Sequence, residues 1–355
     1  MVGRDWIITA LETLQGMKVE HRNYLGIQRR IAAACAAMFR GELLVIVGPS
    51  RVGKTRCIRD GIGIPDENRP DDDQSMRAVI VEAANESTSG EFSTKGFAMA
   101  CLRAIRHPFY GVADEDDPWE QRLNDRLDRT AERRLWSAFE SALTMRKTEF
   151  LVIDEAHHVR YVRGGDQAAA RVLDSWKCLA NKTKVKLVLT GSYSLMSLLS
   201  LAPHLLGRQQ PLEFARYRSN PRSDLEAWEQ LLRRFSQLFQ FQPGESLSTW
   251  NQLLFDGSIG RVGGLSLWLR TALATMLSEG ESHLTKDILQ RTRLPATQEA
   301  AILQEIVAGE RELIRRDTQT PLLQAPQKAV PEAKAKRRPT PFRQKPKRNP
   351  VNGRS

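Results

Sequence analysis

The stretch Leu43-Leu-Val-Ile-Val-Gly-Pro-Ser-Arg-Val-Gly-Lys-Thr55 decides the fold. Its first five residues are apolar and mostly β-branched, so they predict a buried strand. Gly48–Thr55 then matches the pattern G-x-x-x-x-G-K-[ST], and a helix is expected from Lys54 onward. A strand, a glycine-rich turn and a helix in this order predict a phosphate-binding loop.

Such a loop surrounds a phosphate with backbone N–H groups, and the start of the following helix adds partial positive charge. Lys54 would reach the β- and γ-phosphates, and the Thr55 hydroxyl would hold Mg²⁺. The predicted cofactors are therefore ATP and Mg²⁺. The expected nucleotide-binding residues are Gly48, Pro49, Ser50, Arg51, Val52, Gly53, Lys54, Thr55 and Arg56.

Polar residues also follow two later apolar runs. Phe150–Ile153 reads as a strand that ends in Asp154 and Glu155. Asp154 would orient Mg²⁺, and Glu155 would polarise the attacking water as general base; the alternative is an acidic strand end facing solvent. After the next strand, Thr190 or Ser192 could hydrogen-bond the γ-phosphate or the water, or simply cap the helix that follows.

Phosphoryl transfer also needs positive charge near the γ-phosphate. Arg208 is the first candidate for an arginine finger that serves a neighbouring subunit, and Arg216 and Arg218 are rivals. Arg261 lies in the glycine-rich stretch Gly260–Gly264 and could touch the γ-phosphate from a second domain. For each of these arginines, a solvated surface charge is the alternative.

Alternating strands and helices predict a parallel α/β sheet, and after Tyr217 only helical spacing is seen. The expected strands are 43–47, 77–83, 150–153, 186–189 and 212–214, and the expected helices between them are 54–61, 94–106, 119–145 and 167–182. The expected parts are an N-terminal helical segment 1–40, an α/β core 41–218, a small all-helical domain 219–318 and a disordered tail 319–355.

The net charge of +11 is concentrated in this tail. Residues 321–355 hold ten Lys or Arg against one Glu, together with seven prolines, so this segment cannot bury a core. It could bind DNA phosphates or a protein partner, or act as a solubilising tail. No apolar run reaches the ~20 residues of a membrane helix, no signal-peptide core is seen at the N-terminus, and the four cysteines are far apart. We therefore expect a cytoplasmic protein with no membrane contact.

Two further groups of residues are weaker indicators of function. Lys95, Arg103 and Arg106 lie on or beside one expected helix and could meet DNA phosphates, although a solvated helix face is the alternative. The adjacent His157 and His158 point in different directions and lack further ligands nearby in the sequence, so a metal site is not expected there.

The chain resembles the TnsC/TniB group of AAA+ ATPases from Tn7-like transposition and, more distantly, MuB and IstB. The resemblance rests on the order Gly48–Thr55, Phe150–His158 (FLVIDEAHH) and Leu173–Leu195. Leu206–Phe214 is similar to the arginine-finger turn and fifth strand of the group, and Ser258–Gly264 to its lid glycine motif. It implies an AAA+ P-loop core with a five-stranded parallel sheet, followed by a helical lid.

The resemblance also implies a function. ATP would lie between protomers, with Arg208 acting in trans, and a homo-oligomeric ring or filament would form on double-stranded DNA. A target-selection protein would direct this assembly, which would recruit and activate a DDE transposase, with the tail as a candidate docking segment.

Two other classes compete with this hypothesis. An Orc/Cdc6-like or STAND-type ATPase would share the motifs but would use nucleotide chiefly for signalling. A DEAH-type helicase is suggested by Asp154–His157, yet it needs two tandem α/β domains, and only one fits this chain.

Overall fold

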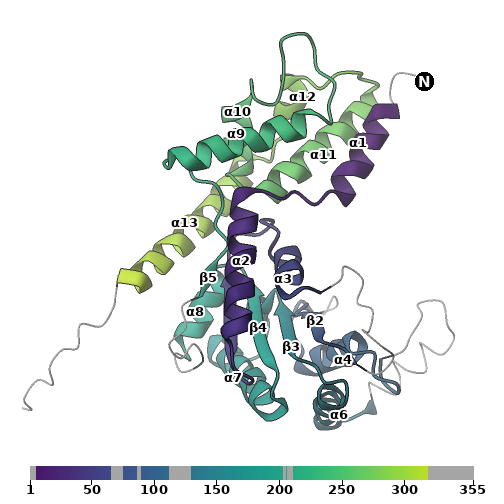
Figure 1. Cartoon of the computed structure of the whole chain (residues 1–355), viewed down its shortest axis with the longest axis vertical. Coiled ribbons are helices and arrows are strands. Elements are labelled where there is room, and N and C mark those ends of the chain that lie inside the picture. The colour runs from purple at the N-terminus through teal and green to yellow at the C-terminus, as the bar shows by residue number, and fades with distance from the viewer. Residues whose placement is uncertain are drawn as a thin grey trace, which may run out of the picture. The chain divides into compact units, whose positions relative to one another are not determined.

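The computed structural model describes residues 5–64, 75–85, 89–111, 129–202, 205 and 211–318, with side chains to Arg315 (Figure 1). Arg208 and the segment 319–355 lie outside these residues. Contacts divide the chain into two units, Met1–Glu312 and Leu313–Ser355.

A single five-stranded parallel sheet forms the centre of the first unit, which confirms the predicted sheet. Along the sheet the order is β2-β3-β4-β1-β5. The strands are β1 (Leu43–Val47), β2 (Ala78–Glu82), β3 (Phe150–Asp154), β4 (Lys186–Gly191) and β5 (Leu212–Glu213). Every residue of β1 and β3 is buried, as expected for central strands covered on both faces.

The strand order brings three sequence motifs to one edge of the sheet. β4 lies between β1 and β3, with Val47 opposite Gly191 and Ile153 opposite Leu189. Since all the strands run in the same direction, the loop after β1, the acidic pair at the end of β3 and the residues ending β4 meet at their carboxyl ends. This is the edge at which open α/β sheets bind ligands.

Helices connect and cover the strands. They are α2 (Arg22–Ala37), α3 (Lys54–Ile62), α4 (Thr94–Ala104), α6 (Glu132–Met145), the short 3₁₀ helix η1 (Ala156–Tyr161), α7 (Gly165–Thr183) and α8 (Ser194–Ser200). One expectation is wrong here: the helix predicted over 119–145 is not continuous, because residues 130–131 are not helical and α6 begins after them. Residues 112–128 lie outside the described part.

Between β5 and Thr318 the described residues are helical, apart from turns and one isolated β-bridge between Phe241 and Leu284. The helices are α9 (Arg222–Ser236), α10 (Asn251–Ser258), α11 (Val262–Glu279), α12 (Lys286–Arg291) and α13 (Ala296–Thr318). A second hydrophobic cluster, around Trp228, Leu232 and Leu269, is buried among them. We call α9–α12 with residues 296–312 of α13 the helical subdomain.

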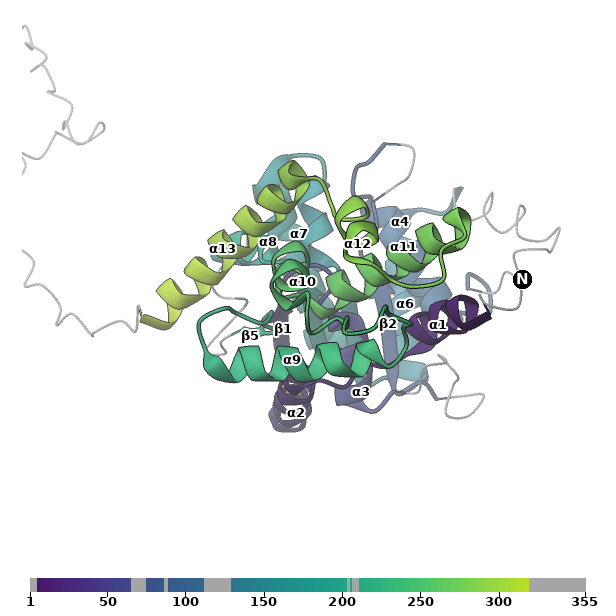
Figure 2. The same ribbon diagram turned by 90° about the horizontal axis from the view of Figure 1, so that it is seen from above.

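The first helix of the chain packs into this second cluster and not against the sheet. α1 (Asp5–Gly16) buries Ile7, Ala10 and Leu14, whose spacing places them on one helix face. It lies beside α11 in both views (Figures 1 and 2). The two N-terminal helices therefore pack against different parts of the unit. α1 packs with the helical subdomain, whereas α2 packs with α3 and with a hydrophobic cluster beside the sheet that includes Ile31 and Ile46. No helix in the described residues is long and apolar enough to cross a membrane.

Candidate functional site

The loop between β1 and α3 has a backbone that glycine makes possible. Gly53 has φ +96°, a conformation that glycine adopts without strain. A β-carbon on Gly48 would stand 2.5 Å from the carbonyl oxygen of Phe214, so the loop can pass β5 only with glycine at this position. Arg51 also has a left-handed backbone, with φ +63°. A strained loop held in this way is preorganised to surround an anion.

Lys54 fills the inside of this loop. Its ammonium group is buried and donates hydrogen bonds to the carbonyl oxygens of Gly48 (3.2 Å) and Pro49 (3.1 Å). Burial lowers the pKa of Lys54, while the carboxylates of Glu155 and Asp154 oppose this shift. Among the described residues, the hydrogen bonds of the buried Lys54 ammonium go to backbone carbonyls, so its positive charge is one that a phosphate would complement.

Asp154 is held from two directions. The Thr55 hydroxyl, in the first turn of α3, donates to Asp154 Oδ2, and Asp154 Oδ1 accepts from the N–H of Glu155 (2.8 Å). Burial raises the pKa of Asp154, which the hydrogen bond from Thr55 opposes. A hydroxyl and a carboxylate side by side are the protein ligands that Mg²⁺ takes beside a nucleotide. The donor set therefore fits Mg²⁺.

Glu155 has an unusual backbone conformation. Its φ is +47°, in the left-handed region, which costs a non-glycine residue roughly 1 kcal/mol or more. Its side chain is 28% exposed and lies 3.1 Å from the Nδ1 atom of His157. The hydrogen bond with His157 lowers the pKa of Glu155, and the positive charge of Lys54 adds to this effect. The group therefore stays a carboxylate, the form that a base requires.

The two polar residues that end β4 differ in their surroundings. Thr190 is fully buried, and within the described residues its hydroxyl has no hydrogen-bond partner. Ser192 Oγ lies 2.8 Å from Ser194 Oγ, at the start of α8. The Ser192 hydroxyl thus bonds another side chain, and α8 has no side-chain cap hydrogen bond, so the structure does not confirm helix capping by Ser192. The buried Thr190 hydroxyl, without a partner among the described residues, is available to a ligand group.

Arg261 connects the helical subdomain to the loop. It is 3% exposed, donates from Nε to the carbonyl oxygen of Ser258 (3.1 Å) and reaches the carbonyl oxygen of Ser50 with Nη1 (3.5 Å). Burial lowers the pKa of this guanidinium, with repulsion from Arg51 adding to the shift. The structure thus brings Arg261 and the phosphate-binding loop together.

The two rival finger arginines are engaged within the chain. Arg216 donates to both carboxylate oxygens of Glu310 on α13, at 3.0 and 3.3 Å, and both side chains are mostly buried. Arg218 lies 3.4 Å from Glu213 and 3.5 Å from Glu310. Arg208 lies outside the described residues.

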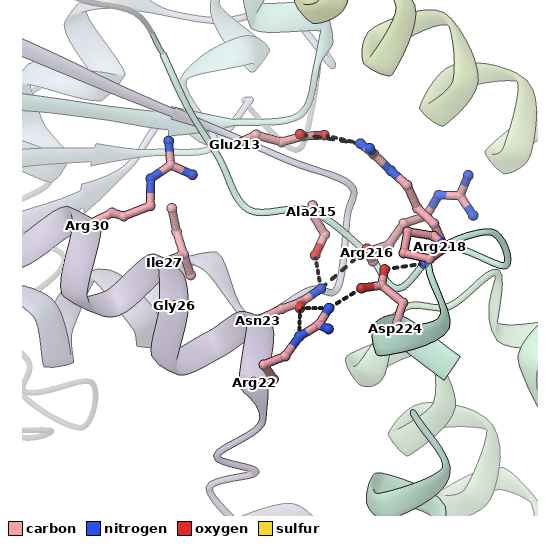
Figure 3. Close-up of a pocket in the computed structure, with 11 residues that line it drawn as sticks. Arg22, Asn23, Gly26, Ile27, Arg30, Glu213, Ala215, Arg216, Arg218 and Asp224 are labelled. Atoms are coloured by element: carbon pink, nitrogen blue, oxygen red, sulfur yellow. Dashed lines mark hydrogen bonds and ion pairs between the residues drawn. The ribbon is translucent and has the colours of Figure 1, made fainter. Parts of the chain in front are cut away.

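Figure 3 shows Glu213, Arg216 and Arg218 among the residues around a cavity of about 420 Å³ between α2 and the segment that follows β5. Asn23 donates there to the carbonyl oxygens of Ala215 (3.2 Å) and Arg216 (3.4 Å), and Arg22 pairs with Asp224. Contacts of this kind fix the chain where it passes from the sheet to the helical subdomain.

The remaining predicted residues lie on or beside two helices, α3 and α4. Arg56 is half-buried on α3, next to Thr55. Lys95 opens α4, whereas Arg103 lies near its end, about 12 Å away along the helix axis at 1.5 Å per residue, and Arg106 follows the helix. Among the described residues no group of His, Cys, Asp and Glu could hold a metal ion by itself, His157 and His158 included.

One contact in the site, that of His157 with Glu155, was not predicted from the sequence. The sequence did contain a hint of this contact, because Glu155 and His157 are only two positions apart. It became meaningful only with the left-handed backbone of Glu155, which turns the chain and brings His157 beside the carboxylate.

Comparison with known proteins bears on the fold. Residues 37–199 match the family model described as AAA domain, and no curated protein matches the chain. Cdc6p from Pyrobaculum aerophilum has a similar structure, with a TM-score of 0.50, 13% identity and coverage of 79% of this chain and 69% of that one. At this identity the likeness concerns the fold alone.

Two further structures have lower scores. A Walker-type ATPase of Pyrococcus abyssi gives a TM-score of 0.45 at 16% identity, covering 82% of this chain and 75% of that one. The ORC2 protein of Aeropyrum pernix in its ADP form gives 0.47 at 12% identity, covering 75% and 66%. The domain match, the sheet order and the complete phosphate-binding loop together identify an ATPase with the AAA+ P-loop fold.

Proposed function

We propose that this AAA-domain ATPase is a transposition regulator that assembles on double-stranded DNA when it binds ATP and links the chosen target to a DDE transposase. The observation that carries the proposal is the junction between the loop and the helical subdomain, where Arg261 reaches Ser50. A nucleotide in the loop would contact both the loop and the helical subdomain, so its γ-phosphate can shift the equilibrium between their arrangements. The resemblance of Phe150–His158 and Ser258–Gly264 to the TnsC/TniB group supports the assignment to transposition.

In this proposal, each residue of the site has one task. Lys54 and the backbone of residues 48–55 bind the phosphates, and Thr55 and Asp154 hold Mg²⁺, which neutralises phosphate charge when it is bound. Glu155 accepts a proton from the attacking water. Thr190 and Arg261 hydrogen-bond the γ-phosphate or its surroundings.

Arg208 acts in trans in this proposal, at the nucleotide of the neighbouring protomer. The engagement of Arg216 and Arg218 with acidic residues of their own chain supports Arg208 over these two rivals. Mixing tests this directly: a protein with Arg208→Ala keeps its own nucleotide site, and a protein with Lys54→Ala keeps its finger. Each is expected to be inactive alone, and the mixture to regain ATPase activity. No gain on mixing would contradict a finger in trans.

DNA binding and partner binding complete the proposal. Lys95, Arg103 and Arg106 are the candidate contacts to DNA phosphates, and the basic segment 319–355 is the candidate docking segment for the transposase. Binding through phosphates would be independent of DNA sequence and would weaken steeply as salt is raised.

The second candidate is an Orc/Cdc6-like or STAND-type switch that binds nucleotide chiefly to signal. The fold is similar to that of Cdc6p over most of this chain, and one fold can serve either function. The two candidates differ in the expected effect of ATP. A switch would bind ATP chiefly to signal to a partner protein, whereas the transposition regulator would form nucleotide-dependent assemblies on DNA.

Negative-stain microscopy with duplex DNA separates them. The protein is examined with ATP and Mg²⁺, with ADP, and as Glu155→Gln with ATP. Rings or filaments on DNA with ATP, absent with ADP and longer-lived in Glu155→Gln, are the expected result, because that variant should bind ATP but hydrolyse it at least ~10²-fold more slowly. Monomers under every condition would refute assembly and favour the switch.

A further inference from the structure

One nitrogen atom of His157 lies between the general base candidate and the end of β4. Its Nδ1 is 3.1 Å from Glu155 Oε2 and 3.4 Å from the backbone nitrogen of Ser192, whose N–H points at it. The imidazole comes this close to β4 because residue 191 is glycine. A β-carbon on Gly191 would stand 3.1 Å from His157 Nδ1 and 3.3 Å from its backbone nitrogen.

These two partners make opposite demands on the same atom. The carboxylate of Glu155 can only accept a hydrogen bond, so it requires a proton on Nδ1. The N–H of Ser192 can only donate, so it requires the Nδ1 lone pair. Neutral imidazole has one protonated and one bare nitrogen, so it satisfies one partner at a time and must change tautomer to satisfy the other.

The end of β4 is in turn linked to the phosphate-binding loop. The N–H of Gly48 donates to the carbonyl oxygen of Gly191 (3.3 Å), and Thr190 is paired with Ile46 in the register. A continuous set of contacts therefore runs from the loop through Gly191 and Ser192 to His157 and on to Glu155.

We propose that His157 is a positioning residue that couples the end of β4 to Glu155. Its Nδ1 either donates a hydrogen bond to the carboxylate or accepts one from the N–H of Ser192. With the proton on Nδ1, the carboxylate is held beside η1. With Nδ1 bare, His157 bonds β4 and releases Glu155 for the attacking water. The inference rests on the proposed role of Glu155 as the general base.

His158 provides a matched control from the same turn of chain. Its ring lies against that of His157, with centroids 4.4 Å apart, but its Nδ1 faces the carbonyl oxygen of Ala83 (3.2 Å). Asparagine at position 157 provides the conservative variant. Its amide group places either a donor or an acceptor two bonds from Cβ, where Nδ1 stands in histidine.

The first measurement compares ATP hydrolysis by His157→Ala, His157→Asn and His158→Ala. We expect kcat to fall by about tenfold or more in His157→Ala, while KM and the Kd of a non-hydrolysable ATP analogue stay within about threefold, because only the placement of the base is lost. His157→Asn should recover most of kcat, and His158→Ala should resemble the unaltered protein. Equal losses in the two alanine variants, or no recovery with asparagine, would overturn the proposal.

The second measurement needs no nucleotide and no activity. With ¹⁵N-labelled histidine, the imidazole nitrogen shifts report which ring nitrogen carries the proton, and the His157 signals are identified by their loss in His157→Asn. The Nδ1–H form is expected in the unaltered protein, and the Nε2–H form in Glu155→Ala, where only Ser192 remains as a partner. An unchanged tautomer would overturn the proposal even if His157→Ala fails to fold.

The two measurements also separate this inference from the role of Glu155. If Glu155→Gln hydrolyses ATP normally, Glu155 is not the base, whatever the tautomer of His157 does. If Glu155→Gln is inactive but the tautomer of His157 is unchanged in Glu155→Ala, Glu155 remains the proposed base and the coupling through His157 is refuted.

Discussion

The carbonyl oxygen of Arg51, in the phosphate-binding loop, occupies the place where a side chain at Gly263 would begin. A β-carbon built on Gly263, in the first turn of α11, would stand 2.3 Å from that oxygen. The helical subdomain and the loop therefore touch backbone to backbone. The spacing between them depends on one missing methyl group.

Gly263→Ala should separate the loop from α11. Overpacking of this kind costs about 1–3 kcal/mol, and we expect nucleotide affinity to fall by about tenfold, a change equivalent to 1.4 kcal/mol. Titration with a fluorescent ATP analogue measures the change. Gly264→Ala is the matched control, because the nearest atom to its β-carbon, the carbonyl oxygen of Ser258, is at an ordinary 3.4 Å. Equal affinities in the two variants would contradict the role of the contact.

Arg261→Lys should reduce the preference for ATP over ADP. Lysine keeps the charge but cannot reach Ser258 and Ser50 together as the guanidinium does. We expect the ratio of the two dissociation constants to change by about tenfold, with ADP affinity little affected, since the lost contact faces the γ-phosphate in our proposal. Calorimetric titration with each nucleotide tests this. Arg233→Lys, an exposed residue paired with Glu229, should leave the ratio unchanged.

Gly309→Ala should destabilise the fold although alanine favours helices. A β-carbon on Gly309 would stand 2.1 Å from Cγ of Tyr193, the residue that opens α8. We expect the free energy of unfolding to fall by about 1–3 kcal/mol in urea titrations. In contrast, Gly26 is exposed on α2 with no atom within 4 Å of its β-carbon. Gly26→Ala should therefore stabilise by roughly 0.5–1 kcal/mol. A stabilised Gly309→Ala would refute the close contact.

Stability should fall as the pH is lowered from 7 to 5, in part because of His21. Burial lowers the pKa of His21 to about 4, and its Nδ1 lies 3.0 Å from the Tyr217 hydroxyl. Below the ordinary pKa of 6.5 the unfolded chain takes up a proton that the folded chain refuses, so folding loses about 1.4 kcal/mol per pH unit. This amounts to roughly 2 kcal/mol between pH 6.5 and pH 5.

His21→Asn should remove this part of the pH dependence. Asparagine keeps an acceptor for the N–H of Tyr24 at the start of α2 but does not titrate. Urea unfolding of both proteins at pH 7 and pH 5 gives the comparison, and a parallel loss of stability in the two would show that His21 is not the group responsible.

Much of the fold follows from local pattern. Four of the five strands contain a short apolar run, so period and composition suffice to predict them, whereas β5 is only Leu212–Glu213. The predicted sheet is confirmed. The helix expected over 119–145 is the failure, because helical spacing alone does not reveal that residues 130–131 leave the helix. The place of α1 was also beyond sequence analysis: its apolar face predicts burial but does not name the partner.

For the nucleotide site, too, some features could be predicted from the sequence and others required the structure. Residues 48–55 and the pair Asp154–Glu155 are contiguous motifs, whose chemistry can be read from residue type and spacing alone. Their meeting at one edge follows from parallel strands, and the described structure shows Thr55 bonded to Asp154, 99 positions further along the chain.

By itself, the sequence determined the phosphate-binding loop, the acidic pair, the class of the sheet and the helical nature of residues 222–318, because each depends on neighbours along the chain. Only the tertiary structure decided that Arg261 reaches Ser50, that Arg216 is paired with Glu310, and that His157 stands between Glu155 and Ser192. These contacts depend on strand order, on a left-handed residue and on glycines that allow close backbone approach. Their effect is set by distances across the fold, which spacing along the chain does not specify.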